Sequence, residues 1–294
     1  MFPKIVVATD RSEESRELVG CLRGLKALGT GSAVLVYCVP LPEAPGLAQR
    51  VADFLGPALE KQRRLLADAG LEASLRVAAG RPEVELRRIA EEEGAAAIVL
   101  DAKPEGFLAG WILPSLAGSL IRGITLPLLI VRFEACGEGG ATCYRGFPCT
   151  ALEHVLFPTD FSDGAERAFA YVERAVEAGA RRVTLLHVQD RAKIARHLED
   201  RLEEFNRTDR ARLERLKDRL LAKGAADVRI AIPYGSPTQE VLLRCRPDDV
   251  SLVVMGTQGR GFIREVFLGS VSHNVARAAG VSVLLVPGPR QGGA

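Results

Sequence analysis

The sequence predicts an α/β fold made of two tandem doubly wound domains, each a five-stranded parallel sheet of strand order 3-2-1-4-5 flanked by helices. Three observations support this prediction. The chain repeats itself once, each repeat alternates short apolar runs with helical segments, and those runs are apolar on both faces. Strands of that kind, separated by helices, are typical of a parallel sheet that is covered on both sides.

The internal repeat extends over most of the chain. Residues 4–10, KIVVATD, match residues 154–160, HVLFPTD, at an offset of 150. From Gly80 onward the offset becomes 155, and the match continues without a gap to the last apolar run of each half. The difference in length therefore falls in the long charged segment of each half, and the two halves are expected to share one fold.

Each half is expected to alternate five strands with four helices. Ser12 and Ser162 stand at N-cap positions with acidic residues in the next turn, and Ser236-Pro237 marks another helix start. The longest helical segment covers 191–223, and its mixed charges indicate a solvated face rather than a binding patch. The expected strands are IVVAT, AVLVY, ASLRVA, AAIVL and PLLIV in the first half, and VLFPT, VTLLHV, DVRIAI, SLVVM and VSVLLV in the second.

Composition and charge argue against several classes of protein. The 294 residues have a formal net charge of +2, which does not indicate a strongly basic nucleic-acid binder. No apolar run reaches the ~18 residues that suggest a membrane span. The first residues enter a strand pattern directly, so we expect no signal peptide and a cytoplasmic location.

A segment without periodicity separates the two repeats. It is rich in glycine and cysteine, and it divides the chain into expected domains at 1–133 and 152–294 that are joined by a linker at 134–151. The linker cysteines do not have C-x2-C zinc spacing and no fourth ligand is evident, so free thiols in a flexible linker are expected, with metal binding or a redox switch as alternatives. These cysteines are Cys136, Cys143 and Cys149.

The other three cysteines lie in periodic segments. Cys21, Cys38 and Cys245 are expected to be small buried apolar residues.

A glycine-rich segment follows the fourth strand of the second half. The strand ends at Met255, and Gly256-Thr257-Gln258-Gly259, nine further residues and Gly269-Ser270 follow, where a helix pattern begins. Glycine lets the backbone approach a ligand closely, and the first turn of a helix offers free N–H groups and a positive dipole end. With strand order 3-2-1-4-5, this segment lies beside the end of strand 1, Pro158-Thr159-Asp160, at the crevice where such folds bind ligands. The segment is therefore predicted to bind phosphate.

The first half has lost this segment. The alignment places Asp101 at Gly256, and it places prolines at the positions of Gly259 and Gly269. Aspartate repels phosphate, and proline lacks an N–H and fixes φ. The first half is thus expected to fold without binding a nucleotide in the same way, and Asp10 is expected to cap a helix. The two prolines are Pro104 and Pro114, and only Ser115 keeps its counterpart, Ser270.

The pattern Gly-x2-Gly-x9-Gly-Ser at 256–270 resembles that of the ATP-binding members of the universal stress protein family. The resemblance covers essentially the whole chain as a tandem pair, except the linker, and implies an α/β fold of the adenine nucleotide alpha hydrolase-like type. It implies that adenine and ribose contact Pro158, Thr159, Asp160 and Val188. It also implies that the phosphates lie along the loop after Met255, on Gly256, Gln258, Gly259, Arg260, Gly269, Ser270, Val271 and Ser272.

The resemblance also implies a cofactor and partners. The cofactor is ATP, with ADP and AMP left open, and Mg²⁺ is expected with the phosphates, although no carboxylate cluster marks a metal cage. Asp160 is equally suited to accept from ribose hydroxyls and to cap the helix after it. The family pairs domains through the last strand, so the runs LPLLIVRF and VSVLLVP are expected to join the halves as a pseudo-dimer, with a homodimer as a further arrangement.

The function that this pattern favours is an ATP-binding stress-response regulator in which nucleotide occupancy changes conformation or partner affinity. Slow ATP hydrolysis is the enzymatic alternative, although no residue is an evident base for water. A Walker NTPase and a dehydrogenase are disfavoured, because no Gly-Lys-Ser/Thr follows a glycine loop and the glycines follow strand 4 rather than strand 1. His154 and His187 are expected to be packed or hydrogen-bonded, and His273 lies close to the phosphate helix.

Overall fold

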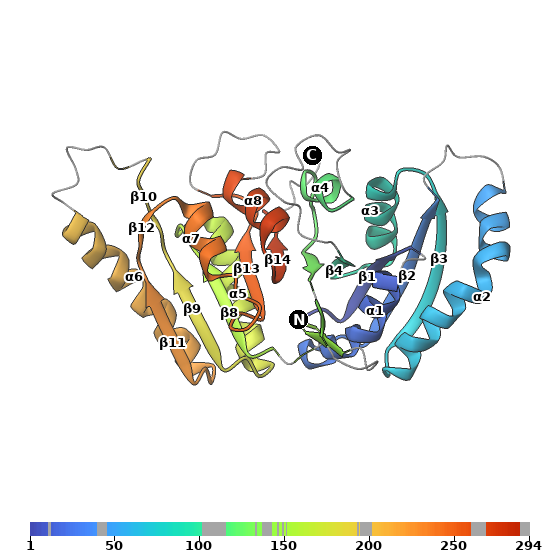
Figure 1. Ribbon diagram of the computed structural model, residues 1–294, viewed down its shortest axis with the longest axis horizontal. Helices are drawn as coiled ribbons and strands as arrows, with labels where there is room; N and C mark the ends of the chain where they lie inside the picture. The colour runs from blue at the N-terminus through green and yellow to red at the C-terminus, as the bar shows by residue number, and fades with distance from the viewer. Residues whose placement is uncertain are drawn as a thin grey trace. The chain divides into compact units, whose positions relative to one another are not determined.

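The computed structural model describes the chain in two compact units, and the second unit begins at Leu152. In each unit, strands alternate with helices along the chain (Figure 1). The described residues are 1–10, 13–39, 46–101, 116–132, 134–136, 143–145, 147–148, 150, 152–192, 194, 202–259 and 269–288.

The first unit contains a parallel sheet in which five strands have the order β3-β2-β1-β4-β5. This is the 3-2-1-4-5 order that the sequence predicts. The strand in the middle, β1, is buried along almost its whole length because helices cover both faces. The strands are β1 (Lys4–Thr9), β2 (Ser32–Val39), β3 (Glu72–Ala79), β4 (Ala97–Asp101) and β5 (Leu128–Val131).

Helices form a layer on each face of this sheet. α1 packs beside α2, and α3 packs beside α4. α3 begins with proline in its first turn, where a missing N–H costs nothing. The helical segments are α1 (Glu13–Cys21), the 3-10 helix η1 (Leu22–Leu28), α2 (Leu47–Asp68), α3 (Pro82–Glu92) and α4 (Leu116–Ile121).

The second unit repeats the topology. Its main sheet is parallel and has the order β11-β9-β8-β13-β14, again 3-2-1-4-5. A second, two-stranded parallel ladder, β10 with β12, extends beyond the ends of β9 and β11. The strands are β8 (His154–Pro158), β9 (Arg182–Leu186), β10 (Gln189–Asp190), β11 (Asp227–Ala231), β12 (Tyr234–Gly235), β13 (Leu252–Gly256) and β14 (Ser282–Val286).

The helices α5, α7 and α8 of the second unit begin where the sequence predicts. Ser162 caps α5, because its Oγ accepts the Ala165 N–H at 3.2 Å. Ser236 precedes Pro237 at the start of α7, although its side chain makes no capping bond. α6 begins at Leu202 rather than at residue 191, and residues 191–192 form a turn instead of helix. The helices are α5 (Asp163–Glu177), α6 (Leu202–Ala222), α7 (Pro237–Arg244) and α8 (Ser270–Ala278).

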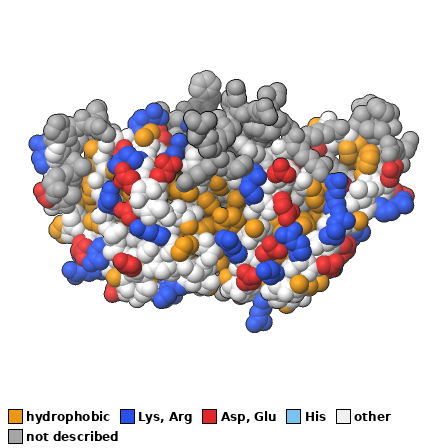
Figure 2. Space-filling model, turned by 180° about the vertical axis from the view of Figure 1, so that it is seen from behind, with side chains coloured by type: hydrophobic (Ala, Val, Ile, Leu, Met, Phe, Trp, Pro, Cys, Tyr) orange, Lys and Arg blue, Asp and Glu red, His pale blue; other side chains and the backbone are white. Residues whose placement is uncertain are grey.

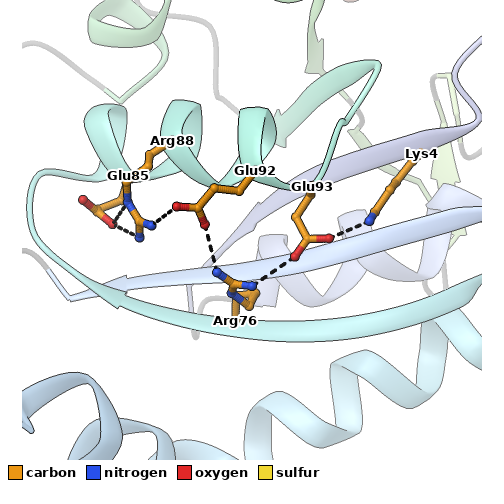
Figure 3. A network of polar contacts seen from close by, with 6 residues as sticks. All are labelled: Lys4, Arg76, Glu85, Arg88, Glu92 and Glu93. Atoms are coloured by element: carbon orange, nitrogen blue, oxygen red, sulfur yellow. Dashed lines mark hydrogen bonds and ion pairs between the residues drawn. The ribbon is translucent and has the colours of Figure 1, made fainter.

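Ion pairs connect the C-terminal end of α3 to strands β1 and β3 of the first unit (Figure 3). Lys4 of β1 contacts Glu93 at 2.5 Å, and Arg76 of β3 contacts both Glu92 and Glu93 at 3.1 Å. Arg88 also pairs with Glu92. The hydrogen bond from Lys4 is the main cause of the lowered pKa of Glu93. These side chains are partly exposed, so each pair contributes at most about 1 kcal/mol.

The linker contains structure that the sequence does not predict. β6 (Glu134–Cys136) and β7 (Cys143–Arg145) form an antiparallel hairpin in which Cys136 lies opposite Cys143. After it, Phe147 is 1% exposed, so this part of the linker is packed rather than flexible. A hairpin of three-residue strands has too few residues to show a period.

Of the three cysteines predicted to be buried apolar residues, Cys245 is confirmed, Cys38 is only half-buried and Cys21 has a bond that was not predicted. Cys21 is buried as expected, but it is disulfide-bonded rather than a plain apolar residue. Cys38 and Cys245 are free thiols, and burial is the main reason why the pKa of each is raised to about 12. Cys149 lies outside the described residues, so whether it is a free thiol stays a prediction.

No helix in the described part of the chain is both long and apolar enough to cross a membrane. Acidic and basic side chains are interspersed on the face seen in Figure 2.

Candidate functional site

The end of β8 forms a tight turn that leads into α5. The Asp160 Oδ1 atom accepts the Ser162 N–H at 3.1 Å, and the Thr159 Oγ1 atom accepts the Phe161 N–H at 3.0 Å. Between them Phe161 has φ +58°, a value that bulky residues rarely adopt and that stores strain. Asp160 thus stabilises the turn but is not the N-cap of α5, which is Ser162, and contact of Asp160 with ribose stays a prediction.

Glycine is required at Gly256 because the first turn of α5 lies directly against it. A Cβ added at Gly256 would lie 2.7 Å from the Gly164 carbonyl carbon and oxygen. A Cβ added at Gly164 would lie 2.3 Å from the Gln258 carbonyl oxygen, which also accepts from the Ser162 hydroxyl at 3.4 Å. Gly256 thus permits close packing of strand on helix. The sequence prediction attributed this glycine to the approach of a ligand, and the contact with α5 gives it a second cause.

Gly259 lies against the carboxylate of the strand-1 turn. A Cβ added there would lie 2.5 Å from the Asp160 Oδ2 atom. The structure therefore brings together Asp160 and the glycine segment, which the sequence places 99 positions apart. Any larger residue at this position displaces the carboxylate, and proline would in addition remove the N–H.

The two ends of the glycine segment, at Thr257 and Gly269, are hydrogen-bonded to each other, and this closure is called the neck. The Gly269 N–H donates to the Thr257 carbonyl at 2.8 Å, and the buried Ser272 hydroxyl lies 3.1 Å from the same oxygen. Thr257 is itself fixed, because its N–H donates to the Val286 carbonyl at 3.0 Å. The hydroxyl of Ser272 therefore helps to close the neck, and contact of Ser272 with a phosphate stays a prediction. Arg260, also predicted to contact phosphate, lies outside the described residues.

α8 begins at this neck. Its N-cap is Gly269, which has no side chain, and among the described residues no side-chain hydrogen bond caps the first turn. The N–H groups at the start of α8, from Ser270 and Val271 onward, thus need another acceptor. Together with the helix dipole they favour an anion at this end.

The predicted contact for the base, Val188, lies just past the end of β9. It is partly exposed and is flanked by two well-fixed residues. The Nδ1 atom of His187 lies 2.8 Å from the Thr159 carbonyl oxygen, and Gln189 is buried in β10. Pro158, Thr159 and Val188 are therefore brought to one end of neighbouring strands, as predicted.

The two strand histidines are hydrogen-bonded, as expected. His154 is buried, with its ring nitrogens 2.9 Å from the Thr184 hydroxyl and 3.1 Å from the Asp249 carbonyl oxygen. The N–H of His273 donates to the Gly269 carbonyl oxygen inside α8.

The equivalent strand end in the first unit is closed by protein. Gln62 of α2 is buried, and it accepts from the Thr9 hydroxyl at 2.6 Å and donates to the Asp10 carbonyl at 3.3 Å. Cys38 stands at the position of Val188, and its raised pKa, due first to burial and then to Glu85, keeps it as a neutral thiol. The prolines at 104 and 114 and Ser115 lie outside the described residues.

Sequence reasoning did not find Gly164. The signal is available, because the repeat offset of 150 places Glu14 opposite Gly164. The first unit thus lacks glycine both here and at Asp101, the counterpart of Gly256. The two positions that lack glycine in the first unit are those that meet in the second.

Metal ligands are not gathered in the described part of the chain, where no group of three or more His, Cys, Asp or Glu side chains could hold an ion. The linker cysteine side chains are not among those described, so metal binding by them stays untested.

Comparison with known proteins follows the two-unit organisation. The model of the universal stress protein family matches residues 1–132 and 151–287. The chain is 31% identical over 151 residues to a universal stress protein of Methanocaldococcus jannaschii, an alignment that covers 45% of this chain and 93% of that protein. It is 30% identical over 138 residues to one of Thermus aquaticus, covering 45% of this chain and 96% of that protein.

A solved structure shows the same fold over the full length. The crystal structure of a universal stress protein from Archaeoglobus fulgidus aligns with 98% of this chain and 97% of its own, with a TM-score of 0.70 and 19% sequence identity. Because the family model matches both halves of the chain, the protein belongs to the universal stress protein family.

Proposed function

We propose that the second unit binds an adenine nucleotide and that its occupancy acts as a conformational or partner switch. ATP is the first candidate, with ADP and AMP as alternatives. One observation supports this most strongly: the uncapped first turn of α8 begins at a closed neck beside the turn that contains Asp160. Uncapped N–H groups at a helix start are suited to the oxygens of phosphates.

The residues present fit such a ligand. The backbone N–H groups of Gly259, Ser270 and Val271 would hold the phosphates, and the end of β8 with Val188 would contact ribose and base. Asp160 is the carboxylate beside Gly259, so a Mg²⁺ ion that arrives with the phosphates would be placed near it. The protein would supply positioning and charge complementarity.

The first unit would not bind nucleotide in the same way. It has Asp101 in place of Gly256, and Gln62 already occupies the end of β1. We therefore expect one nucleotide per chain. Isothermal titration calorimetry measures this number directly, and two equivalent sites would contradict the proposed asymmetry.

Substitution of Gly259 tests the phosphate contact. Gly259→Ala keeps the N–H and only displaces the Asp160 carboxylate, whereas Gly259→Pro also removes the N–H. We expect a moderate loss of ATP affinity for the first variant and loss of measurable binding for the second, with far-UV circular dichroism unchanged for both. Equal affinity of Gly259→Pro and the unmodified protein would refute the assignment. Mass spectrometry of any ligand that copurifies identifies the nucleotide.

Two alternatives have defined tests. Sustained phosphate release from ATP well above the background of a Gly259→Pro control would favour a slow ATPase. The disulfide of Cys21 favours a second function, a response to redox state through the cysteines. A nucleotide affinity that differs between reduced and oxidised protein would support it.

Assembly is a separate proposal. We expect the two units to associate through β5 and β14, and a homodimer is a further arrangement. Sedimentation velocity, with and without ATP, measures the assembly of the whole chain.

A further inference from the structure

The ladder between strands 1 and 2 ends earlier in the second unit than in the first. In the first unit the pairs of β1 with β2 include Thr9 opposite Tyr37. In the second unit the pairs of β8 with β9 stop at Pro158 opposite Leu186. The next pair, Thr159 with His187, is the counterpart of the Thr9 pair at the repeat offset of 150, and it is missing from the ladder.

A side chain takes the place of this last rung. The Thr159 N–H still donates to the Leu186 carbonyl at 2.9 Å. In a parallel ladder the Thr159 carbonyl would next accept from the N–H two residues further along, which is that of Val188. Instead the His187 Nδ1 atom lies 2.8 Å from this carbonyl oxygen, and since a carbonyl only accepts, Nδ1 donates.

The imidazole is held in this position from three sides. The Asp209 Oδ2 atom of α6 lies 3.4 Å from His187 Nε2, and Gln189 donates to the same oxygen at 3.4 Å. The ring of Phe161 packs on the imidazole, with 4.6 Å between centroids. The His187 and Asp209 side chains are only 13% and 15% exposed. The ring is thus enclosed, and its Nδ1 atom faces the sheet.

The consequence concerns the backbone of Val188. Within the described part of the chain, no hydrogen bond from the Val188 N–H is found, and the residue is partly exposed at the carboxyl end of β9. An N–H that the ladder would otherwise use is available to a ligand. The equivalent residue in the first unit, Cys38, remains inside β2 and pairs with Ala78 of β3.

We propose that His187 is a positioning residue for nucleotide binding: its imidazole satisfies the Thr159 carbonyl and so leaves the Val188 N–H free to donate to an acceptor nitrogen on the base. This rests on the proposed function of the same site. The ligand class is a base with an unprotonated ring nitrogen at its edge, such as adenine. A guanine presents an N–H at the corresponding position and would bind more weakly.

The test copies the first unit by replacing His187→Tyr, with His187→Phe as a second variant that keeps a ring but has no polar group. Without nucleotide, single-residue hydrogen exchange by NMR should show a fast-exchanging Val188 amide in the unmodified protein and a slow one in both variants. AMP affinity should fall about tenfold, the effect of one lost hydrogen bond. Tyr37→His in the first unit is the matched control and should leave affinity unchanged.

The outcomes are distinguishable. A Val188 amide that exchanges as slowly as that of Leu186 in the unmodified protein without nucleotide would overturn the role of His187, and so would unchanged AMP affinity in both variants. If the unmodified protein binds no adenine nucleotide, the proposed function fails. The exchange comparison then still decides whether His187 ends the ladder.

Discussion

Gly164→Ala should destabilise the second unit although alanine is the better helix former. The new Cβ would lie 2.3 Å from the Gln258 carbonyl oxygen, about 1 Å closer than an ordinary contact, and this partner is backbone. Overpacking of this kind costs about 1–3 kcal/mol, and the gain from helix propensity offsets at most about 1 kcal/mol. A net loss of about 1–2 kcal/mol lowers the melting temperature of a unit of this size by about 3–7 °C.

Differential scanning calorimetry measures this change. Gly280→Ala is the matched control in the same unit, because the nearest atom to its added Cβ is Pro247 Cγ at an ordinary 3.7 Å. Gly256→Ala should behave like Gly164→Ala, and the double variant should lose less than the sum of the two, since both methyl groups separate the same pair of elements. A melting temperature for Gly164→Ala within 1 °C of the control would refute the packing argument.

Three further predictions concern the first unit and the thiols. Gln62→Leu should lower stability by about 1–3 kcal/mol in urea titrations, because it leaves the Thr9 hydroxyl without its buried acceptor; an unchanged midpoint would contradict this. At pH 8 the thiols of Cys38 and Cys245 should react with iodoacetamide roughly a thousandfold more slowly than in urea, since a pKa of about 12 leaves little thiolate; mass spectrometry follows both rates, and rapid labelling of the native protein is the opposing result. Peptide mapping without reductant should join Cys21 to a linker peptide, because the other two cysteines outside the linker are free, and a reduced Cys21 would contradict the bond.

Most of the fold could be predicted because it depends on signals that are local and repeated. Ten strands and their order follow from apolar runs and from the duplication, and Ser162 marks its helix by the chemistry of a cap. The early end of β9 could not be predicted. The run VTLLHV predicts a strand to Val188, but the ladder of β8 with β9 ends at Leu186, where His187 bonds to a carbonyl 28 residues away.

The position of the candidate site could be predicted from the sequence, but the contacts that require its glycines could not. The glycines after Met255 are visible in the sequence, and the structure places them beside Asp160 as the topology requires. Sequence could not show that Gly256 contacts Gly164, because that depends on how closely a helix crosses a strand. The hairpin around Cys136 has no sequence signature because its three-residue strands are too short to show a period.

The glycine contact between α5 and β13 also limits how the two halves can diverge after duplication. Each glycine is tolerable to lose only when the other has already gone, so the first loss is the costly one and the second is nearly neutral. The first unit has Glu14 and Asp101, and so no glycine, at these two positions. Return of glycine at either position alone would loosen the backbone without bringing the helix closer. Changes at this contact are therefore hard to reverse one at a time. Natural variants of the first unit should accumulate further differences from the second at these positions rather than regain both glycines.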